Sequence, residues 1–205
     1  MKALLLSVLL MTLMACSSKP LNLNYYVLST PQAAVPNQHS VSRVQIILQP
    51  ILLADYLKQS SLVMQIAEHQ MYFSRQDIWA ERLDKAIQKT LLEDLNRSQH
   101  AQFRAYPGLA GESNTLSLTV QIDYFHPTFN STVVSAGRYW IVDPSSQQSL
   151  EKTFYLSLKL TQDGYAHAVE KQRELLQLLA NEIQQNLESS ELTAPAKTTV
   201  PVSQP

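Results

Sequence analysis

The sequence predicts an α+β fold, a single domain in which two long helices pack on a mainly antiparallel sheet. Between residues 116 and 160, three successive segments alternate apolar with polar residues or are rich in β-branched residues, which is typical of strands that bury one face. Two other segments, residues 77–95 and 163–187, repeat apolar residues every three or four positions, the spacing of an amphipathic helix. Successive strands with turn-rich connections favour an antiparallel meander, which the helices are expected to cover.

The most regular strand pattern runs from residue 116 to residue 124. Apolar and polar residues alternate strictly there, so one face is predicted to be buried and the other solvated. Strands over Thr132–Val142 and over Phe154–Leu160 are predicted to follow. The residues of the first strand that are predicted to face the core are Leu116, Leu118, Val120, Ile122 and Tyr124.

Shorter strands are predicted in the first half of the chain. Apolar or β-branched runs bounded by turn residues are the pattern on which they rest. Residues 31–40, with two prolines, are predicted to form a loop. The predicted strands are Tyr25–Leu28, Val41–Leu48, a hairpin of Leu62–Ile66 with Met71–Phe73, and an edge strand Phe103–Tyr106 before the Pro107-Gly108 turn.

Each predicted helix begins with an acidic residue and carries an apolar stripe. Asp77 and Asp163 are the expected N-caps, because a short carboxylate can accept hydrogen bonds from the first free N–H groups of a helix. Both stripes are interpreted as core contacts, and Trp79 and Trp140 as core residues rather than as parts of a ligand pocket. The first stripe contains Trp79, Leu83, Ile87, Leu91 and Leu95; the second contains Tyr165, Val169, Gln172, Leu176, Leu179, Ile183 and Leu187.

Residues 1–15 have the layout of a secretory signal peptide. A single positive charge at Lys2 precedes an apolar run that ends in a small residue, Ala15. A helix of this length would span about 20 Å, against about 30 Å of membrane hydrocarbon, so a permanent membrane span is not expected. We expect the segment to be cleaved.

The residues around Cys16 resemble the processing site of bacterial lipoproteins. That pattern is an aliphatic residue, a small residue, Gly or Ala, and then the cysteine that is lipidated; Leu13, Ala15 and Cys16 fit it, and Met14 departs from it. Acyl chains such as palmitate contribute about 0.8 kcal/mol per buried methylene, so several of them anchor a protein stably. The alternative is an ordinary cleaved signal followed by an incidental cysteine. Ser17 resembles the sorting residue of outer-membrane lipoproteins, which predicts lipid anchoring to the cell outer membrane, facing the periplasm.

Composition limits the other possibilities. The chain has 16 basic and 17 acidic residues and a formal net charge of −1, so no nucleic-acid partner is indicated. With Cys16 used as the anchor, no thiol remains for a disulfide. The predicted organisation is a signal peptide (1–15), a lipidated tether (16–24), an α+β domain (25–189) and a disordered tail rich in Pro, Ser and Thr (190–205).

The sequence shows no constellation typical of an enzyme, a metal site or a cofactor site. The five histidines lack paired metal-ligand spacing, and four glycines cannot form a phosphate-binding loop. Asp123 and His126 could place a carboxylate near an imidazole, but no serine lies in a nucleophile elbow. We therefore expect no catalytic activity, no cofactor and no metal. The histidines, which are interpreted as surface residues, are His39, His69, His100, His126 and His167.

Several short motifs occur along the chain in a characteristic order and spacing. They are Cys16-Ser17-Ser18, Asn24-Tyr25-Tyr26 with Leu28, Asp55-Tyr56-Leu57, Trp79-Ala80 with Leu83-Asp84, Thr115-Leu116, Gly137 with Trp140, and Thr161-Gln162-Asp163-Gly164-Tyr165. Together these motifs resemble the ABC-type transport auxiliary lipoprotein family across most of residues 16–187. The chain departs from the family at Ala54, where a proline is usual, at Arg138 and Tyr139 after Gly137, and in the tail from Glu191.

The resemblance implies an outer-membrane lipoprotein of an MCE-type system that moves lipids between membranes. It implies two partners, a periplasm-spanning MCE-domain protein and an integral inner-membrane protein, and a homo-oligomer is possible. The alternative is a structural or assembly lipoprotein without a role in lipid flux. Because the apolar stripes suffice only to cover one face of the sheet, docking without a lipid cavity is expected. The candidate interface residues are Tyr25, Tyr26, Asp55, Tyr56 and Leu57, of which Tyr56 and Leu57 are expected to be exposed.

Overall fold

The computed structural model confirms the α+β fold and describes residues 21–30, 44–97, 101–108, 115–146, 148–190 and 192. The predicted signal peptide (1–15), the lipidation site Cys16, the predicted loop 31–40 and residues 193–205 of the predicted tail lie outside the described residues. Within the predicted tail, Leu192 is half-buried and packs against the main core.

The larger sheet contains the predicted antiparallel meander. Strands β7 (Leu116–Thr128), β8 (Thr132–Val142) and β9 (Ser149–Lys159) pair in sequence order, and β8 has the predicted bounds. The order of the sheet is β6-β2-β7-β8-β9, with β3 also paired to β7. The sequence did not predict that β2 would be parallel to both β6 and β7. The additional strands are β2 (Val44–Leu48), β3 (Leu52–Leu53) and β6 (Ala101–Ala105).

A smaller sheet of three strands contains the predicted hairpin. Strands β4 (Ser61–Ala67) and β5 (Gln70–Trp79) are antiparallel, and β1 (Asn24–Tyr26) lies parallel to β5 at the edge. The carbonyl of Tyr26 also accepts a hydrogen bond from Ala80 N–H at 2.8 Å. The predicted first strand thus exists, but it pairs with a strand about fifty residues later in the chain.

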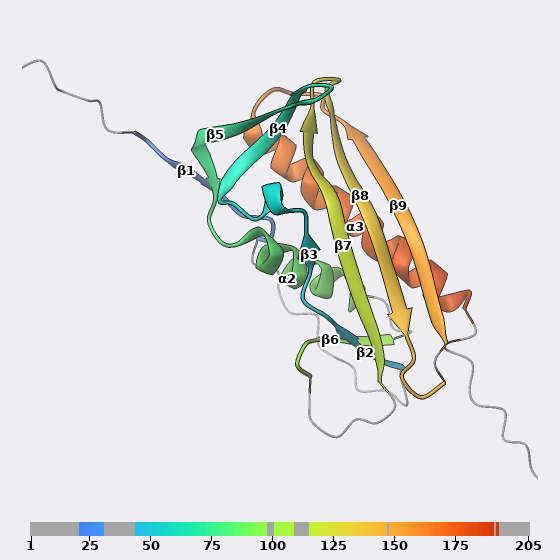
Figure 1. The fold of residues 1–205 in the computed structure, drawn as a ribbon. Helices are drawn as coiled ribbons and strands as arrows, with labels where there is room; N and C mark the ends of the chain where they lie inside the picture. Colours follow the sequence, from blue (N-terminus) through green and yellow to red (C-terminus); the bar gives the residue numbers. More distant parts are fainter. Residues whose placement is uncertain are drawn as a thin grey trace, which may run out of the picture.

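Two helices cover one face of the larger sheet, as predicted. Helix α3 (Tyr165–Glu188) runs behind β7–β9, and α2 (Leu83–Leu95) packs beside it (Figure 1). The predicted stripe of α3 is buried from Val169 to Leu187, and Tyr165 at its start is half-buried. A short 3₁₀ helix, η1 (Asp55–Leu57), lies next to β7 on the side of the sheet away from α3 (Figure 1).

The predicted start of the first helix is wrong. Strand β5 continues to Trp79, and α2 begins only at Leu83. Asp77 therefore caps no helix; its carboxylate accepts hydrogen bonds from Asn24 Nδ2 at 2.9 Å and Tyr26 Oη at 3.1 Å. Trp79 remains a core residue, because the end of β5 and the first turn of α2 point into the same core. Trp79 and Leu83 are four residues apart and both buried, as in a helix, although the first ends a strand and the second begins a helix.

The predicted cap of the second helix is also wrong. Gly164, and not Asp163, is the N-cap of α3, and no side chain makes a capping hydrogen bond there. Gly164 has φ of 103°, a conformation that residues with a Cβ rarely adopt. The backbone thus turns into the helix through glycine.

Candidate interaction surface

The predicted interface segment Asp55-Tyr56-Leu57 forms η1, and its expected exposure is wrong for two of its residues. Leu57 is 2% exposed and belongs to the main core. Tyr56 is half-buried and donates its hydroxyl to the carbonyl of Asp123 at 2.8 Å. Burial raises the pKa of Tyr56 above its ordinary value. These contacts hold η1 against β7, so the segment cannot present both side chains to solvent.

Of the other predicted interface residues, Asp55 and Tyr25 are exposed and Tyr26 is not. The side chain of Asp55 is almost fully exposed and forms a surface ion pair with Lys58 at 2.6 Å, which lowers the pKa of Asp55. Tyr25 on β1 is exposed, whereas Tyr26 is half-buried through its bond to Asp77. The five predicted residues therefore belong to two elements, η1 against β7 and β1 at the edge of the smaller sheet.

A group of rings, two of them more than half exposed, lies beside η1 on the uncovered face of the larger sheet. The Tyr56 and Tyr124 rings each lie 6.0 Å from the His126 ring, measured between centroids. Across the strands, Ala136 on β8 pairs with Tyr124 on one side and Tyr155 on the other. Tyr124 is 54% exposed and Tyr155 is 72% exposed. With Phe129 in the turn between β7 and β8, these residues form what we call the aromatic cluster: Tyr56, Tyr124, His126, Phe129 and Tyr155.

A β-bulge in β7 brings Tyr124 to this face. Ile122 pairs with Gly137 and Tyr124 pairs with the adjacent Ala136, so Asp123 is an extra residue without a partner in the ladder. An extra residue reverses which side chains point to which face. The prediction that Tyr124 faces the core is therefore wrong, and Phe125, 1% exposed, occupies the core instead.

The residue opposite the bulge must be glycine. A Cβ on Gly137 would lie 2.1 Å from the carbonyl oxygen of Gln121, which is far inside van der Waals contact. Gly137 is one of the residues that carried the family resemblance, and the close approach of the two backbones gives it a structural role. The bulge and Gly137 together shape the floor of the aromatic cluster.

His126 is a buried residue beneath the rings, not the surface residue that was expected. Its Nδ1 lies 3.1 Å from the Pro127 carbonyl, which can only accept, so Nδ1 carries the proton in this bond. Burial lowers the pKa of His126. The carboxylate of Asp123 instead accepts a hydrogen bond from Gln121 Nε2 at 2.8 Å. The two side chains considered as a carboxylate–imidazole pair thus have separate hydrogen-bond partners.

Two open hollows adjoin the aromatic cluster. One has a volume of about 320 Å³ and lies among Tyr124, Phe129 and Tyr155, with Gln65 and Glu68 of the β4–β5 hairpin at its border. The other has a volume of about 520 Å³. Thr128 and Phe129 line both. The lining of the larger hollow mixes apolar and polar side chains: Met64, Pro127, Phe129, Leu160, Thr161 and Gln162.

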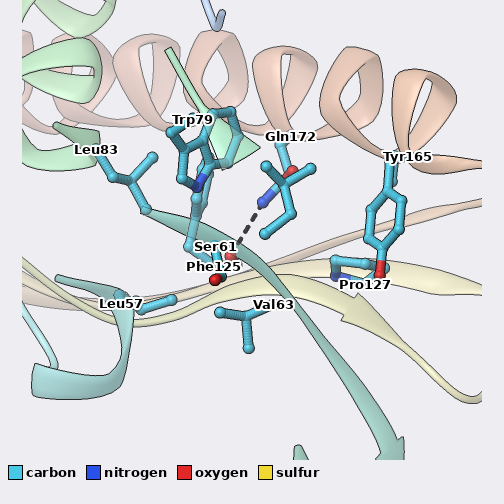
Figure 2. A pocket seen from close by; sticks show the side chains of 11 residues that line it. Leu57, Ser61, Val63, Trp79, Leu83, Phe125, Pro127, Tyr165 and Gln172 are labelled. Carbon is cyan, nitrogen blue, oxygen red and sulfur yellow. Dashed lines mark hydrogen bonds between the residues drawn. The ribbon is translucent and has the colours of Figure 1, made fainter. Parts of the chain in front are cut away.

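By contrast, the enclosed space between the smaller sheet, β7 and α3 is minimal. Figure 2 shows side chains converging there, among them Trp79 of β5, Tyr165 of α3 and Leu83 from the start of α2. Gln172 donates its Nε2 to the Phe125 carbonyl at 3.0 Å across this junction (Figure 2). The remaining void is about 10 Å³, room for one water at most. The junction is a packed contact rather than a lipid-binding cavity.

The rest of the uncovered face is polar. Arg138 donates to Gln121 Oε1 at 3.1 and 3.2 Å, approaches Glu151 at 4.0 Å and lies 5.8 Å from the centre of the Trp140 ring. Trp140 is therefore half-buried on this face and not in the core. The uncovered face thus has an aromatic end near Phe129 and a charged end near Arg138.

Within the described ranges, no group of three or more His, Cys, Asp or Glu side chains could hold a metal ion. In the same part of the chain, none of the helices has the length and hydropathy needed to cross a membrane. The sequence analysis missed Tyr124, Phe129 and Tyr155. One signal was present: Tyr155 alternates with apolar residues and so occupies the predicted solvent face of its strand, where a large ring is unusual.

The described residues thus form an α+β domain with exposed aromatic rings on one face of its larger sheet. The family model described as the ABC-type transport auxiliary lipoprotein component matches residues 26–184. The chain belongs to this family, as the motifs around Tyr26, Asp55 and Trp79 indicated.

Among relatives, the chain is similar to the intermembrane transport lipoprotein PqiC of Escherichia coli strain K12. The two are 27% identical over 169 residues, which cover 82% of this chain and 88% of the relative. PqiC of Shigella flexneri has the same identity and coverage.

Solved structures share the fold. A crystal structure of an uncharacterized protein aligns with a TM-score of 0.67 at 21% identity and covers 81% of this chain and 99% of its own. A protein from Xanthomonas campestris aligns with a TM-score of 0.60 at 12% identity and covers 82% of this chain and all of its own.

Proposed function

We propose that this chain is an outer-membrane lipoprotein of an MCE-type intermembrane lipid transport system of the Pqi kind. In this proposal it docks the periplasm-spanning MCE-domain protein, the PqiB-like component, to the outer membrane and so contributes to envelope integrity. A PqiA-like integral protein is the inner-membrane partner. The role assigns no catalysis to this chain. The observation that carries the proposal is the aromatic cluster on the face of the larger sheet opposite α2 and α3 (Figure 1).

The composition of the cluster suits a protein partner. Tyrosine and phenylalanine are enriched at the centres of protein interfaces because a ring buries a large area with few rotatable bonds. Tyr124 and Tyr155 flank Ala136 at a fixed strand register, and Tyr56 is held by its bond to Asp123. The rings are therefore preorganised, which lowers the entropic cost of binding.

The cavities favour docking over carriage of a lipid. The enclosed void beside Gln172 holds no more than a water. The two larger hollows are open; the Phe129 ring borders both, and the Tyr155 ring borders the one of about 320 Å³. An open hollow with a mixed lining suits the side chains of a partner better than the acyl chains of a lipid, which need a largely apolar enclosure.

The anchor is tested at Cys16. Cys16→Ser should block lipidation and processing, because the thiol is the acylated group, and should leave an uncleaved precursor in the inner membrane. Fractionation and mass spectrometry of the full chain measure both. A variant that matures normally and reaches the outer membrane would contradict the lipoprotein anchor.

Docking is tested with the lipidated full chain in nanodiscs and the MCE-domain partner in solution. Tyr124→Ser and Tyr155→Ser should each weaken binding by about tenfold or more, since truncation of an interface anchor commonly costs at least about 1.4 kcal/mol. Tyr106→Ser is the matched control, because Tyr106 is 57% exposed but follows β6 at the far edge of the larger sheet. Unchanged affinity in both cluster variants would exclude this face as the docking surface. Parent protein that does not bind the partner at all would favour a structural lipoprotein.

A further inference from the structure

The first described residues of the chain form an apolar stripe that the docking role does not use. Leu21, Leu23, Tyr25 and Val27 are between 41% and 63% exposed. They occupy alternate positions of an extended segment that includes β1, and alternate side chains of a strand point to the same side. We call these four residues the N-terminal stripe.

The opposite side of the same segment is attached to the domain. Asn24 and Tyr26 donate to Asp77, and Leu28 is 3% exposed in the core. Because β1 is fixed by this side and by its pairing with β5, the stripe cannot turn inward. Single exposed apolar residues are ordinary, but four at alternate positions of one short segment indicate a contact surface.

The N-terminal part of the chain differs from the rest in that it contains no acidic residue. All 17 acidic residues lie at or beyond Asp55, and the segment before it carries Lys2, Lys19 and Arg43. Between Ser17 and Thr30 the only charged residue is Lys19. An anionic phospholipid surface would therefore meet no repelling carboxylate on the segment that bears the stripe, and Lys19 would be attracted to it.

Chain length places the stripe near the membrane. Five peptide units separate Cys16 from Leu21, a reach of at most about 18 Å when fully extended. Tethering at this distance gives a high effective concentration, so even a weak contact with the bilayer surface would be populated. Leucine and tyrosine together suit the interfacial layer, where apolar side chains meet headgroups.

We infer that the N-terminal stripe inserts into the headgroup region of the membrane that holds the anchor and thereby lays the β1 edge of the domain against the bilayer. The inference rests on the proposed function, because lipidated Cys16 supplies the proximity. Its consequence is orientation: the anchor retains the protein, and the stripe sets how the domain faces the periplasm.

The test uses the lipidated full chain with Val27→Cys, labelled with an environment-sensitive fluorophore. The protein is placed in vesicles of phosphatidylethanolamine and phosphatidylglycerol that carry doxyl-labelled lipid. Thr153→Cys, exposed on β9, is the matched label position. We expect a blue-shifted emission and severalfold stronger quenching at position 27 than at position 153. Adding Leu23→Ser and Tyr25→Ser should reduce the quenching at position 27 to the level at 153.

The remaining outcomes decide against the inference in distinguishable ways. Mass spectrometry first establishes the lipid on Cys16; its absence would contradict the proposed anchor. Lipidated protein with no more quenching at position 27 than at 153 would overturn only the membrane contact of the stripe. A blue-shifted emission at position 27 in the vesicles without stronger doxyl quenching than at position 153 would assign the stripe to a second copy of the chain. Shielding only after the MCE-domain partner is added would assign it to that partner.

Discussion

The two faces of the β7–β9 meander come from the same strands but differ in how far their side chains are exposed. On the face toward α3, Leu118, Val120 and Ile141 are fully buried, and Tyr139 accepts a hydrogen bond from Asn186 of α3 at 2.8 Å. Burial raises the pKa of Tyr139 to about 12, so its hydroxyl stays protonated. On the other face, Tyr124 and Tyr155 are more than half exposed.

The difference shows how an alternating strand can serve stability and contact at once. Side chains on the covered face contribute to folding through burial, at about 25 cal/mol per Å² of apolar area. Rings on the uncovered face contribute little to folding and remain available to a partner. Substitutions on the two faces should therefore have separable effects, on unfolding and on binding respectively.

The largest expected effect on stability comes from breaking the contact between α2 and α3, the two helices that cover the sheet. Asp94 of α2 and Arg173 of α3 form two hydrogen bonds of 2.6 and 2.7 Å, and the side chain of Asp94 is 4% exposed. Asp94→Ala should lower the free energy of unfolding by about 3 kcal/mol, because it leaves the Arg173 guanidinium largely buried without its partner. Chemical denaturation measures this.

The control for that change is the exposed Asp55–Lys58 pair. Asp55→Ala should leave the unfolding midpoint unchanged, because exposed pairs are screened by water. A midpoint for Asp94→Ala equal to that of the parent protein would mean that the ion pair does not hold α2 to α3.

The next largest effect on stability concerns the bulge at Asp123, which places Tyr124 on the uncovered face. Gly137→Ala should destabilise the protein by about 2–3 kcal/mol, because the new methyl group would collide with the Gln121 carbonyl and force the strands apart. Thermal unfolding measures the loss, and near-ultraviolet circular dichroism should report movement of Tyr124. The neighbouring Arg138→Ala, which adds no atoms toward β7, should change both signals far less. Equal stability of Gly137→Ala and the parent would contradict the close backbone approach.

A smaller effect, on the pH dependence of the free energy of unfolding, is expected from His126, which is buried under the rings of the uncovered face. Its pKa in the folded protein is below the ordinary value of 6.5. As pH falls below about 6.5, the unfolded chain takes up a proton that folded His126 does not, so the free energy of unfolding decreases. The contribution is fully present above that pH and is lost as pH falls through the folded pKa.

Urea unfolding at about pH 7.5 and about pH 5.5 measures this dependence, and His126→Gln should reduce the difference between the two values. His69→Asn, in the exposed turn between β4 and β5, is the control and should leave the difference as in the parent. A His126→Gln variant that keeps the full pH dependence would mean that the imidazole is accessible to protons in the folded state.

The smallest effect lies on the covered face. Ser135 is fully buried opposite Phe125, and its hydroxyl has no hydrogen-bond partner among the described residues. Ser135→Ala should be neutral or should raise the free energy of unfolding by up to about 1 kcal/mol, because it removes an unsatisfied buried polar group. Ser157→Ala, on the exposed side of β9, is the matched control and should change nothing. A loss of stability in Ser135→Ala alone would reveal a hydrogen bond to this hydroxyl.

Local patterns in the sequence determined much of this protein. Alternation predicted β7 and β9, and the turn-rich connections favoured the antiparallel order; β8 begins and ends as predicted, at Thr132 and Val142. The four-residue spacing predicted both helices and their buried stripes. These features could be predicted because each side chain's face follows from its neighbours in the chain, and the family motifs could be read in the same way.

Tertiary structure alone decided the rest, because it depends on partners that are distant in the chain. The bulge at Asp123 requires Gly137 on the next strand, and it is the bulge that moves Tyr124 from the predicted core to the surface. The burial of Tyr56 and Leu57 depends on their docking against β7, and the continuation of β5 to Trp79 depends on β1 pairing beside it. Periodicity assigns a side chain to one side of its own element, but only the packing of elements determines whether that side is covered.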